Sequence, residues 1–156
     1  MVVSNTSPLN YLILINQIDL LRQLYGRVLI PPSVLDELRA PETPEAVRMW
    51  TLDLPAWVEV SAAPSADAGL SRLHAGEREA ISLALAVNAA AVLMDERHGR
   101  QEAETRGLKV IGTLGALTAA HEQGLVDLLA AIDSLRQTTF HVSPKLLASI
   151  VLKYRK

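Results

Sequence analysis

Three acidic side chains stand where the expected strands and helices of this chain meet, and they are the best candidates for chemistry. Asp95 directly follows the apolar run 90–94. Glu37 lies in the helix expected after the strand 28–30, and Glu79 opens the most apolar helix. Strand ends and adjacent helix starts converge at one edge of a parallel sheet, so these carboxylates are expected to meet there. Such a cluster persists only if it is protonated or neutralised by a cation.

The chemistry expected of that cluster follows from its ligand atoms. Sites built only from oxygen favour hard divalent ions such as Mg²⁺ or Mn²⁺. Ions of this kind in a crevice suit the hydrolysis of phosphodiester bonds, because they activate a water and stabilise the leaving oxygen. The residue types therefore indicate a metal-assisted hydrolytic site.

Each acid also has a plain structural explanation. Glu79 and its neighbour Glu77 can simply favour a helix N-terminus through the helix dipole. Glu37 can be a surface residue, and Asp95 can cap the helix that follows it. The common placement of these acids on one predicted framework favours the functional interpretation.

The N-terminal segment adds a polar cluster that has two interpretations. The strand expected at residues 2–4 runs into Asn5, Thr6 and Ser7, and Pro8 follows. Ser7 before Pro8 predicts an N-cap and a first helical residue. The alternative is that these side chains lie at the carboxyl edge of the sheet, where ligands bind in open α/β folds.

The framework itself is predicted by alternating strand and helix patterns. Strands are expected at residues 2–4, 28–30, 57–60, 90–94 and 109–111. Helices are expected at residues 8–15, 18–25, 33–38, 45–51, 77–87, 99–106, 114–123, 125–137 and from 143 onward, with a loop at 61–69. This alternation predicts a parallel sheet covered by helices.

The composition of the chain excludes several classes of protein and of functional site. The 156 residues suit one domain, and the absence of cysteine excludes disulfides, thiolate zinc sites and cysteine nucleophiles. No apolar run is long enough to cross a membrane, so no membrane partner and a cytoplasmic protein are expected. The net charge of −2 does not fit binding of nucleic acid by bulk electrostatics. Any contact with RNA would need a local patch or a cation.

Two arginines offer such a local patch. Arg97 and Arg100 follow Asp95 closely and can contact phosphate groups of RNA. They can equally belong to a solvated helix face, with Glu102 and Glu104 as partners.

The order and spacing of these segments resemble the PIN domain family, more narrowly its VapC-like branch. The matching segments are residues 3–9 (Val-Ser-Asn-Thr-Ser-Pro-Leu), 30–38, 76–81, 93–100 and 109–115. The resemblance covers nearly the whole chain. It implies a single domain over residues 1–156, with a three-layer α/β/α sandwich and a central, mostly parallel sheet. It also implies a metal-dependent ribonuclease, often the toxin of a toxin–antitoxin pair.

The resemblance further implies the site residues and partners. The implied metal ligands are Asn5, Glu37, Glu79 and Asp95, and the three acids among them are the implied catalytic residues. The implied supporting residues are Thr6, Ser7, Glu77 and Glu96, the last two as alternates in the register. The implied cofactor is Mg²⁺ or Mn²⁺, and the implied partners are an RNA substrate, a second copy in a homodimer and an antitoxin peptide that blocks the acidic crevice.

Asn5 departs from the family pattern, in which Asp is usual at this position. An amide oxygen can ligate a hard cation but brings no negative charge, so metal affinity and water activation are expected to fall. The alternative function is therefore a catalytically impaired module that binds RNA or a protein partner.

Overall fold

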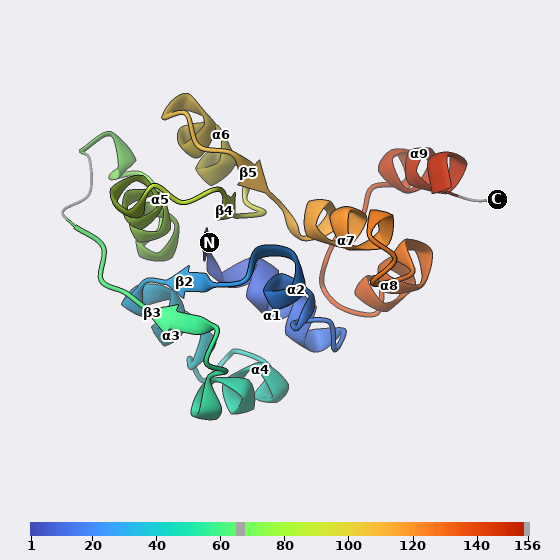
Figure 1. The fold of residues 1–156 in the computed structure, drawn as a ribbon, viewed down its shortest axis with the longest axis horizontal. Coiled ribbons are helices and arrows are strands. Elements are labelled where there is room, and N and C mark those ends of the chain that lie inside the picture. The colour runs from blue at the N-terminus through green and yellow to red at the C-terminus, as the bar shows by residue number, and fades with distance from the viewer. Residues whose placement is uncertain (65–67, 155–156) are drawn as a thin grey trace.

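A five-stranded sheet lies between two layers of helices in the computed structural model, which describes residues 1–64 and 68–154 (Figure 1). The strands are β1 (Val2–Ser4), β2 (Val28–Ile30), β3 (Val58–Val60), β4 (Val92–Leu93) and β5 (Val110–Ile111). They lie in the order β3-β2-β1-β4-β5, and each pairing among the described residues is parallel. The expected α/β architecture is confirmed.

The helices appear where the sequence patterns predict them, with shifted ends. They are α1 (Thr6–Leu14), α2 (Leu20–Tyr25), α3 (Pro32–Leu38), α4 (Glu45–Trp50), α5 (Ala75–Val87), α6 (Arg97–Thr105), α7 (Thr113–Glu122), α8 (Leu128–Leu135) and α9 (Pro144–Tyr154). Short 3-10 helices cover Thr51–Asp53 and Ala68–Leu70. Residues 65–67 of the expected loop and residues 155–156 of the expected last helix lie outside the described residues. Within the described part of the chain, no helix is long and apolar enough to cross a membrane.

The start of α1 corrects one prediction. The helix begins at Thr6 with Asn5 at the N-cap position, so the expected cap at Ser7 is wrong. Ser7 and Pro8 lie inside the first turn instead. Pro8 is tolerated there because the first N–H groups of a helix have no partner within it. The earlier start leaves Asn5 at the end of β1, at the edge of the sheet.

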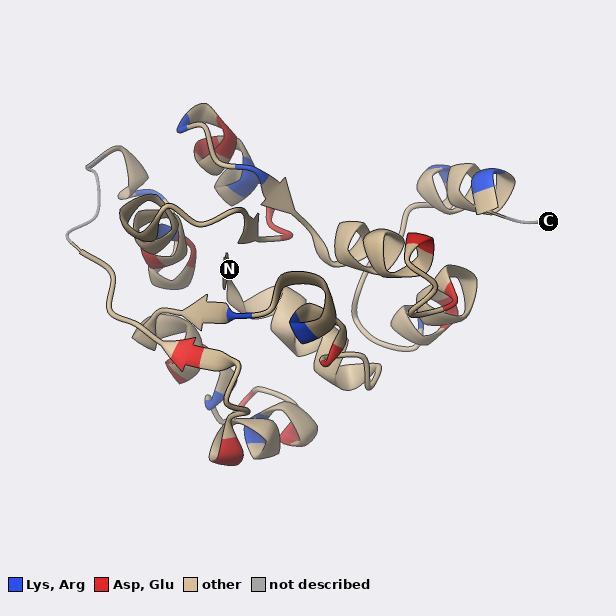
Figure 2. Ribbon diagram, viewed as in Figure 1, with Lys and Arg blue, Asp and Glu red and all other residues tan. Residues whose placement is uncertain are grey.

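Alternation along the strands builds an apolar layer on each face of the sheet. Val2 and Leu93 belong to the core under α1, α2, α7 and α8. Val3 and Val92 belong to the core under α5 and α6. Strands of a parallel sheet are buried on both faces, which explains their short runs of Val, Leu and Ile. Charged residues of both signs are spread over the outer helices (Figure 2).

The strand order reverses next to β1. The chain passes from β1 outward to β2 and β3, and then returns to β4 on the other side of β1. The N–H of Asn5 donates to the carbonyl oxygen of Leu93 at 2.9 Å, which joins the ends of β1 and β4. Ligands of open α/β sheets bind outside the carboxyl ends of the strands at such a switch point. The fold therefore provides a crevice beside Asn5.

Candidate functional site

Asn5 and Glu37 form the first half of the site. The side chain of Thr6 donates a hydrogen bond to Glu37 Oε2 at 2.7 Å, which joins α1 to α3. A methyl group added to Gly76 would lie 2.6 Å from Glu37 Oε1 and 3.2 Å from Asn5 Oδ1. Both oxygens therefore face the same small space beside the start of α5. Glycine at position 76 keeps that space open.

Glu77 and Glu96 form the second half. Glu77 is only 5% exposed, and its Oε1 accepts the N–H of His74 at 3.2 Å. Its Oε2 is buried and has no hydrogen-bond partner among the described residues. Glu96 is the N-cap of α6, where its Oε2 accepts the N–H of Gly99 at 2.6 Å. A methyl group on Gly99 would lie 3.1 Å from Glu77 Oε2, so both carboxylates approach this glycine.

The electrostatics of this acidic pair favour a cation. Burial, and then the neighbouring Glu96, raise the pKa of Glu77, while the N–H of His74 acts in the opposite direction. Desolvation by itself would raise the pKa of Glu96, but the amides of Gly99 and His98 outweigh it and the pKa is lowered. Glu96 therefore holds its negative charge beside a carboxyl that is costly to ionise. A positive ion beside the pair would favour the charged form of Glu77.

A cavity of 340 Å³ joins the two halves and is called the acidic cavity below. Its lining residues are Asn5, Thr6, Ser7, Glu37, His74, Glu77 and Glu96. Carboxylate and amide oxygens of this kind are the ligands that Mg²⁺ and Mn²⁺ prefer. In residues 1–64 and 68–154, no three acidic or histidine side chains stand close enough together to hold one ion. These carboxylates must therefore move closer together to share an ion.

Asp95 lies outside the acidic cavity and connects two elements. Its Oδ1 accepts the N–H of Thr113 at 2.7 Å, and its Oδ2 accepts the Thr113 hydroxyl at 2.7 Å. Burial raises the pKa of Asp95, against the opposing effects of Thr113 and Arg100. Asp95 thus bonds to the start of α7, and Glu96 caps α6 in its place. The interpretation of Asp95 as the cap of the following helix is wrong.

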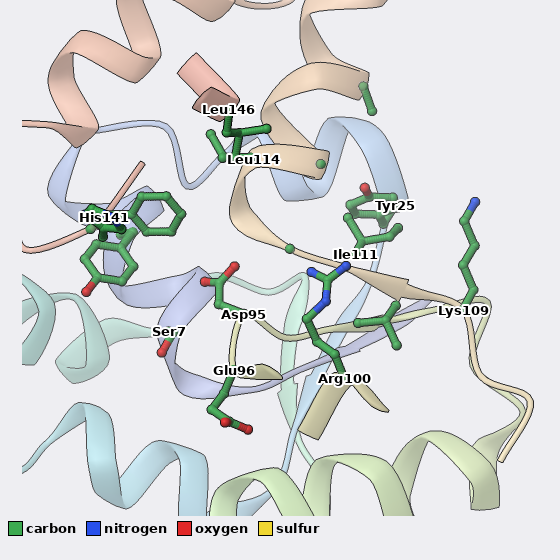
Figure 3. A pocket seen from close by; sticks show the side chains of 16 residues that line it. Ser7, Tyr25, Asp95, Glu96, Arg100, Lys109, Ile111, Leu114, His141 and Leu146 are labelled. Carbon is green, nitrogen blue, oxygen red and sulfur yellow. The ribbon is translucent and has the colours of Figure 1, made fainter. Parts of the chain in front are cut away.

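A larger pocket of 820 Å³ adjoins the acidic cavity and is called the side pocket (Figure 3). Its lining residues are Ser7, Tyr11, Tyr25, Asp95, Glu96, Arg100, Lys109, Val110, Ile111, Gly112, Leu114, Gly115, Ala119, Phe140, His141 and Leu146. Ser7 and Glu96 line both spaces, so the two lie next to each other. Arg100 donates to the carbonyl oxygen of Met94 at 3.3 Å beside Asp95.

The structure separates the expected site residues into two groups. Asn5 and Glu37 line the acidic cavity together with the alternates Glu77 and Glu96. Glu79 lines neither cavity, because α5 begins at Ala75 and turns Glu77 toward Asn5. Asp95 and Arg100 line the side pocket. Arg97 lines neither space.

Sequence reasoning missed two residues that shape the site. Gly76 lets Asn5 and Glu37 approach α5, and Thr113 donates hydrogen bonds to both oxygens of Asp95. The only signal for Gly76 was its position just before Glu77. Thr113 follows the last strand, where a polar side chain at the sheet edge can contact the end of β4.

Comparison with known proteins gives the family. The sequence-family model DUF3368, described as a PIN domain, matches residues 1–156. The solved structure of a PilT N-terminus domain protein from the hyperthermophilic archaeon Sulfolobus solfataricus P2 resembles the fold with a TM-score of 0.51 at 14% identity. That likeness covers 91% of this chain and 98% of the other, and it shows the fold alone. No functionally curated protein matches the chain. The chain belongs to the PIN domain family, whose members are generally nucleases.

Proposed function

We propose that this protein is a Mg²⁺- or Mn²⁺-dependent endoribonuclease that hydrolyses RNA phosphodiester bonds. The observation that carries the proposal is the acidic cavity, where Asn5, Glu37, Glu77 and Glu96 meet at the switch point of the sheet. The unpartnered oxygen of Glu77 supports it, because a buried carboxylate without a donor is costly unless something else pairs with it. Membership of a nuclease family supports the same reaction class.

The residues fit a hard divalent cation by their donor atoms. Asn5 Oδ1 and Glu37 Oε1 face one space, and Glu77, whose buried Oε2 has no donor among the described residues, lines the same cavity. We propose these three residues as the ligands, with Glu96 in support. When bound, such an ion supplies a Lewis acid that activates water and neutralises charge on the phosphate. Glu79 and Asp95, which were also expected as ligands, are not in this set. Glu79 lines neither space, whereas Asp95 lines the side pocket and positions the end of β4.

The neighbouring residues orient these ligands. Thr6 holds Glu37 through its hydroxyl, which limits rotation of that carboxylate before substrate binds. The bonds from Thr113 to Asp95 hold the turn that carries Glu96. Arg100 places a guanidinium beside this turn, where it can contact a phosphate oxygen.

The resemblance to VapC-like proteins leads us to propose a biological role as well. In this role the protein is the cytoplasmic toxin of a toxin–antitoxin pair, and an antitoxin peptide blocks the acidic cavity. A homodimer belongs to the same proposal. Light scattering during size-exclusion chromatography tests the dimer, and a monomer at every concentration would reject it.

Asn5 favours a second candidate function. With an amide where a carboxylate is usual, the cavity holds one negative charge fewer to bind and activate a cation. A protein of this kind could keep the fold and bind RNA or a protein partner without cutting RNA. Restoration of activity by Asn5→Asp in an inactive wild-type protein would identify this case.

A matched pair of variants tests the proposed nuclease. Wild-type protein, Glu77→Gln and Glu79→Gln are incubated with a panel of structured and single-stranded RNAs in Mn²⁺, Mg²⁺ or EDTA. We expect cleavage by the wild type only with metal, about a hundredfold loss in Glu77→Gln and little change in Glu79→Gln. Loss of activity in Glu79→Gln alone would instead assign the metal to the other register. Cutting that persists in EDTA would reject metal dependence.

A further inference from the structure

The side pocket has features that a metal site does not need. We propose that it binds an unpaired nucleotide next to the bond that is cut, with its base against the Tyr11–Phe140 ring pair and its phosphates toward Lys109. Phe140 would then be a specificity-determining residue. This inference rests on the proposed nuclease function and names where the substrate strand lies.

The position of the pocket supports a substrate subsite. Ser7 and Glu96 line both the side pocket and the acidic cavity, so a strand whose phosphate enters one space has the other space beside it. The pocket draws one wall from α1 and another from Phe140 and His141, which precede α9, and from Leu146 within α9. Substrate selection is thereby assigned to a segment far in sequence from the acidic residues.

Aromatic rings stand at one end of the pocket. The rings of Tyr11 and Phe140 meet edge to face, with centroids 4.9 Å apart and planes at 80°. The Tyr11 hydroxyl is 2.9 Å from the Thr139 hydroxyl, which holds the pair against the segment before α9. Both rings are half-buried, and His141 lies exposed beside them. Rigid rings at the wall of an open pocket are the usual platform on which proteins stack unpaired bases.

A free cation stands toward the other end. Figure 3 shows His141 and Lys109 at opposite sides of the pocket, with Asp95 and Arg100 between them. Lys109 is exposed and makes no ion pair with any residue that the structure describes. Asp95 accepts two hydrogen bonds from Thr113, and Arg100 donates to the carbonyl oxygen of Met94 beside it, so Lys109 is the cation that we assign to a phosphate. The pocket of a chain with a net charge of −2 thus contains two cations, beside Asp95 and Glu96.

The size and shape of the pocket favour an unpaired strand. Its volume of 820 Å³ lies within the range of roughly 300–1,000 Å³ typical of small-molecule sites. The bases of a duplex are stacked inside the helix and cannot reach a platform of rings in a pocket. A loop, bulge or single-stranded segment can turn a base outward. The pocket therefore distinguishes unpaired from paired substrates.

Binding without cleavage tests this proposal separately from the nuclease. A labelled strand of about ten nucleotides is titrated with the full-length protein, as RNA, as DNA and as the RNA duplex, with fluorescence anisotropy as the readout. The titrations are run in EDTA and repeated in Ca²⁺. Each base of the RNA strand is then replaced in turn by an abasic sugar.

The variants are matched in pairs. Phe140→Leu removes the ring and keeps apolar volume, whereas Phe140→Tyr keeps the ring. Lys109→Gln removes the pocket cation, and Lys153→Gln removes a cation of α9 that does not line the pocket. Circular dichroism checks that each variant is folded.

We expect single strands to bind at least about tenfold more tightly than the duplex, and one abasic position to weaken binding about tenfold. Phe140→Leu should lose a similar factor and become insensitive to that abasic position, while Phe140→Tyr should not. Lys109→Gln should lower the salt dependence by about one phosphate contact, and Lys153→Gln should leave it unchanged. The RNA and DNA arms show which sugar the pocket accepts.

Several results would overturn the proposal. The proposal fails if duplex and single strands bind equally, or if no strand binds in EDTA or in Ca²⁺. It also fails if the abasic effects are unchanged in Phe140→Leu. Each of these results would leave the pocket to a protein partner. Normal strand binding without metal-dependent cleavage would reject the nuclease alone.

Discussion

Glu77 is the side chain at which stability and the proposed function oppose each other most directly. It is nearly buried, one of its oxygens has no donor among the residues that the structure describes, and its pKa is raised by burial and by Glu96. A carboxyl whose pKa is higher in the folded than in the unfolded protein stabilises the fold below its unfolded pKa. That contribution is lost as the pH rises through the folded pKa. The metal-free protein should therefore lose stability over this window.

Glu77→Gln should stabilise the metal-free protein at neutral pH. The glutamine keeps the acceptor for the His74 N–H and removes the charge, so we expect the free energy of unfolding to rise by about 1 kcal/mol or more. Below the ordinary pKa range of a glutamate the two proteins should melt alike. Thermal melts in EDTA across pH measure this, with Glu79→Gln as a control on the same helix. Equal melting temperatures of wild type and Glu77→Gln at neutral pH would contradict the assignment.

Asn5→Asp should strengthen metal binding. The change adds a full charge to an oxygen that already faces Glu37 Oε1, so we expect Mn²⁺ affinity to rise about tenfold and cleavage to increase. Without metal, the added repulsion should lower the melting temperature. Metal titrations followed by thermal melting measure both effects. Asn16→Asp, on the exposed turn after α1, adds the same charge away from the site and should change neither.

At the scale of elements, the bond between Asp95 and Thr113 joins β4 to α7. Thr113 is fully buried and donates both its N–H and its hydroxyl to this one carboxylate. Hydrogen bonds to a charged group are stronger than neutral ones. The turn that carries Glu96 is thus held between two elements that are not consecutive along the chain.

Thr113→Val should therefore destabilise the protein. It removes the hydroxyl bond but keeps the N–H bond, and we expect a loss of about 1.5–3 kcal/mol in the free energy of unfolding. Chemical denaturation measures the loss. Thr118→Val is the matched control, because the Thr118 hydroxyl donates to the Leu114 carbonyl within α7. Equal effects of the two substitutions would show that the bond to Asp95 has no special weight.

At the scale of the whole molecule, the strand order brings distant acids together. Asn5, Glu37, Glu77 and Glu96 come from the starts of α1 and α5, from α3 and from the cap of α6. They line one cavity only because β1 lies between β2 and β4. A cation held between them would link these elements and stabilise the folded state over the unfolded one.

Mn²⁺ should raise the melting temperature of the wild-type protein. At a concentration a hundredfold above the dissociation constant, binding to the folded state alone adds about 2.7 kcal/mol. In a protein of this size that corresponds to several degrees, roughly 5–10 °C. Glu37→Gln and Glu77→Gln should reduce the shift, and Glu79→Gln should keep it. A melting temperature that millimolar Mn²⁺ leaves unchanged would reject the metal site.

The periodicity of the sequence predicted nearly every strand and helix, because short apolar runs and amphipathic segments are local properties. It failed at element ends. The cap expected at Ser7 lies at Asn5, because the paired end of β1, and not the local Ser-Pro signal, sets where α1 begins. For the same reason, the sequence did not decide which of the adjacent acids Glu77 and Glu79 belongs to the site. Glu77 and Glu79 lie on one helix, and only the packing of α5 against β1 and α3 decides which of them faces the cavity.

The sequence by itself determined the α/β class, the parallel sheet and the family, since these depend on patterns that run along the chain. Through the family resemblance it also predicted one set of ligands, Asn5, Glu37, Glu79 and Asp95. The tertiary structure alone decided that Glu77 lines the acidic cavity, that Asp95 bonds to Thr113 and that Phe140, His141 and Leu146 line the side pocket. Each of these depends on side chains brought together from separate elements. Their contacts depend on strand order and helix packing, which no local pattern contains.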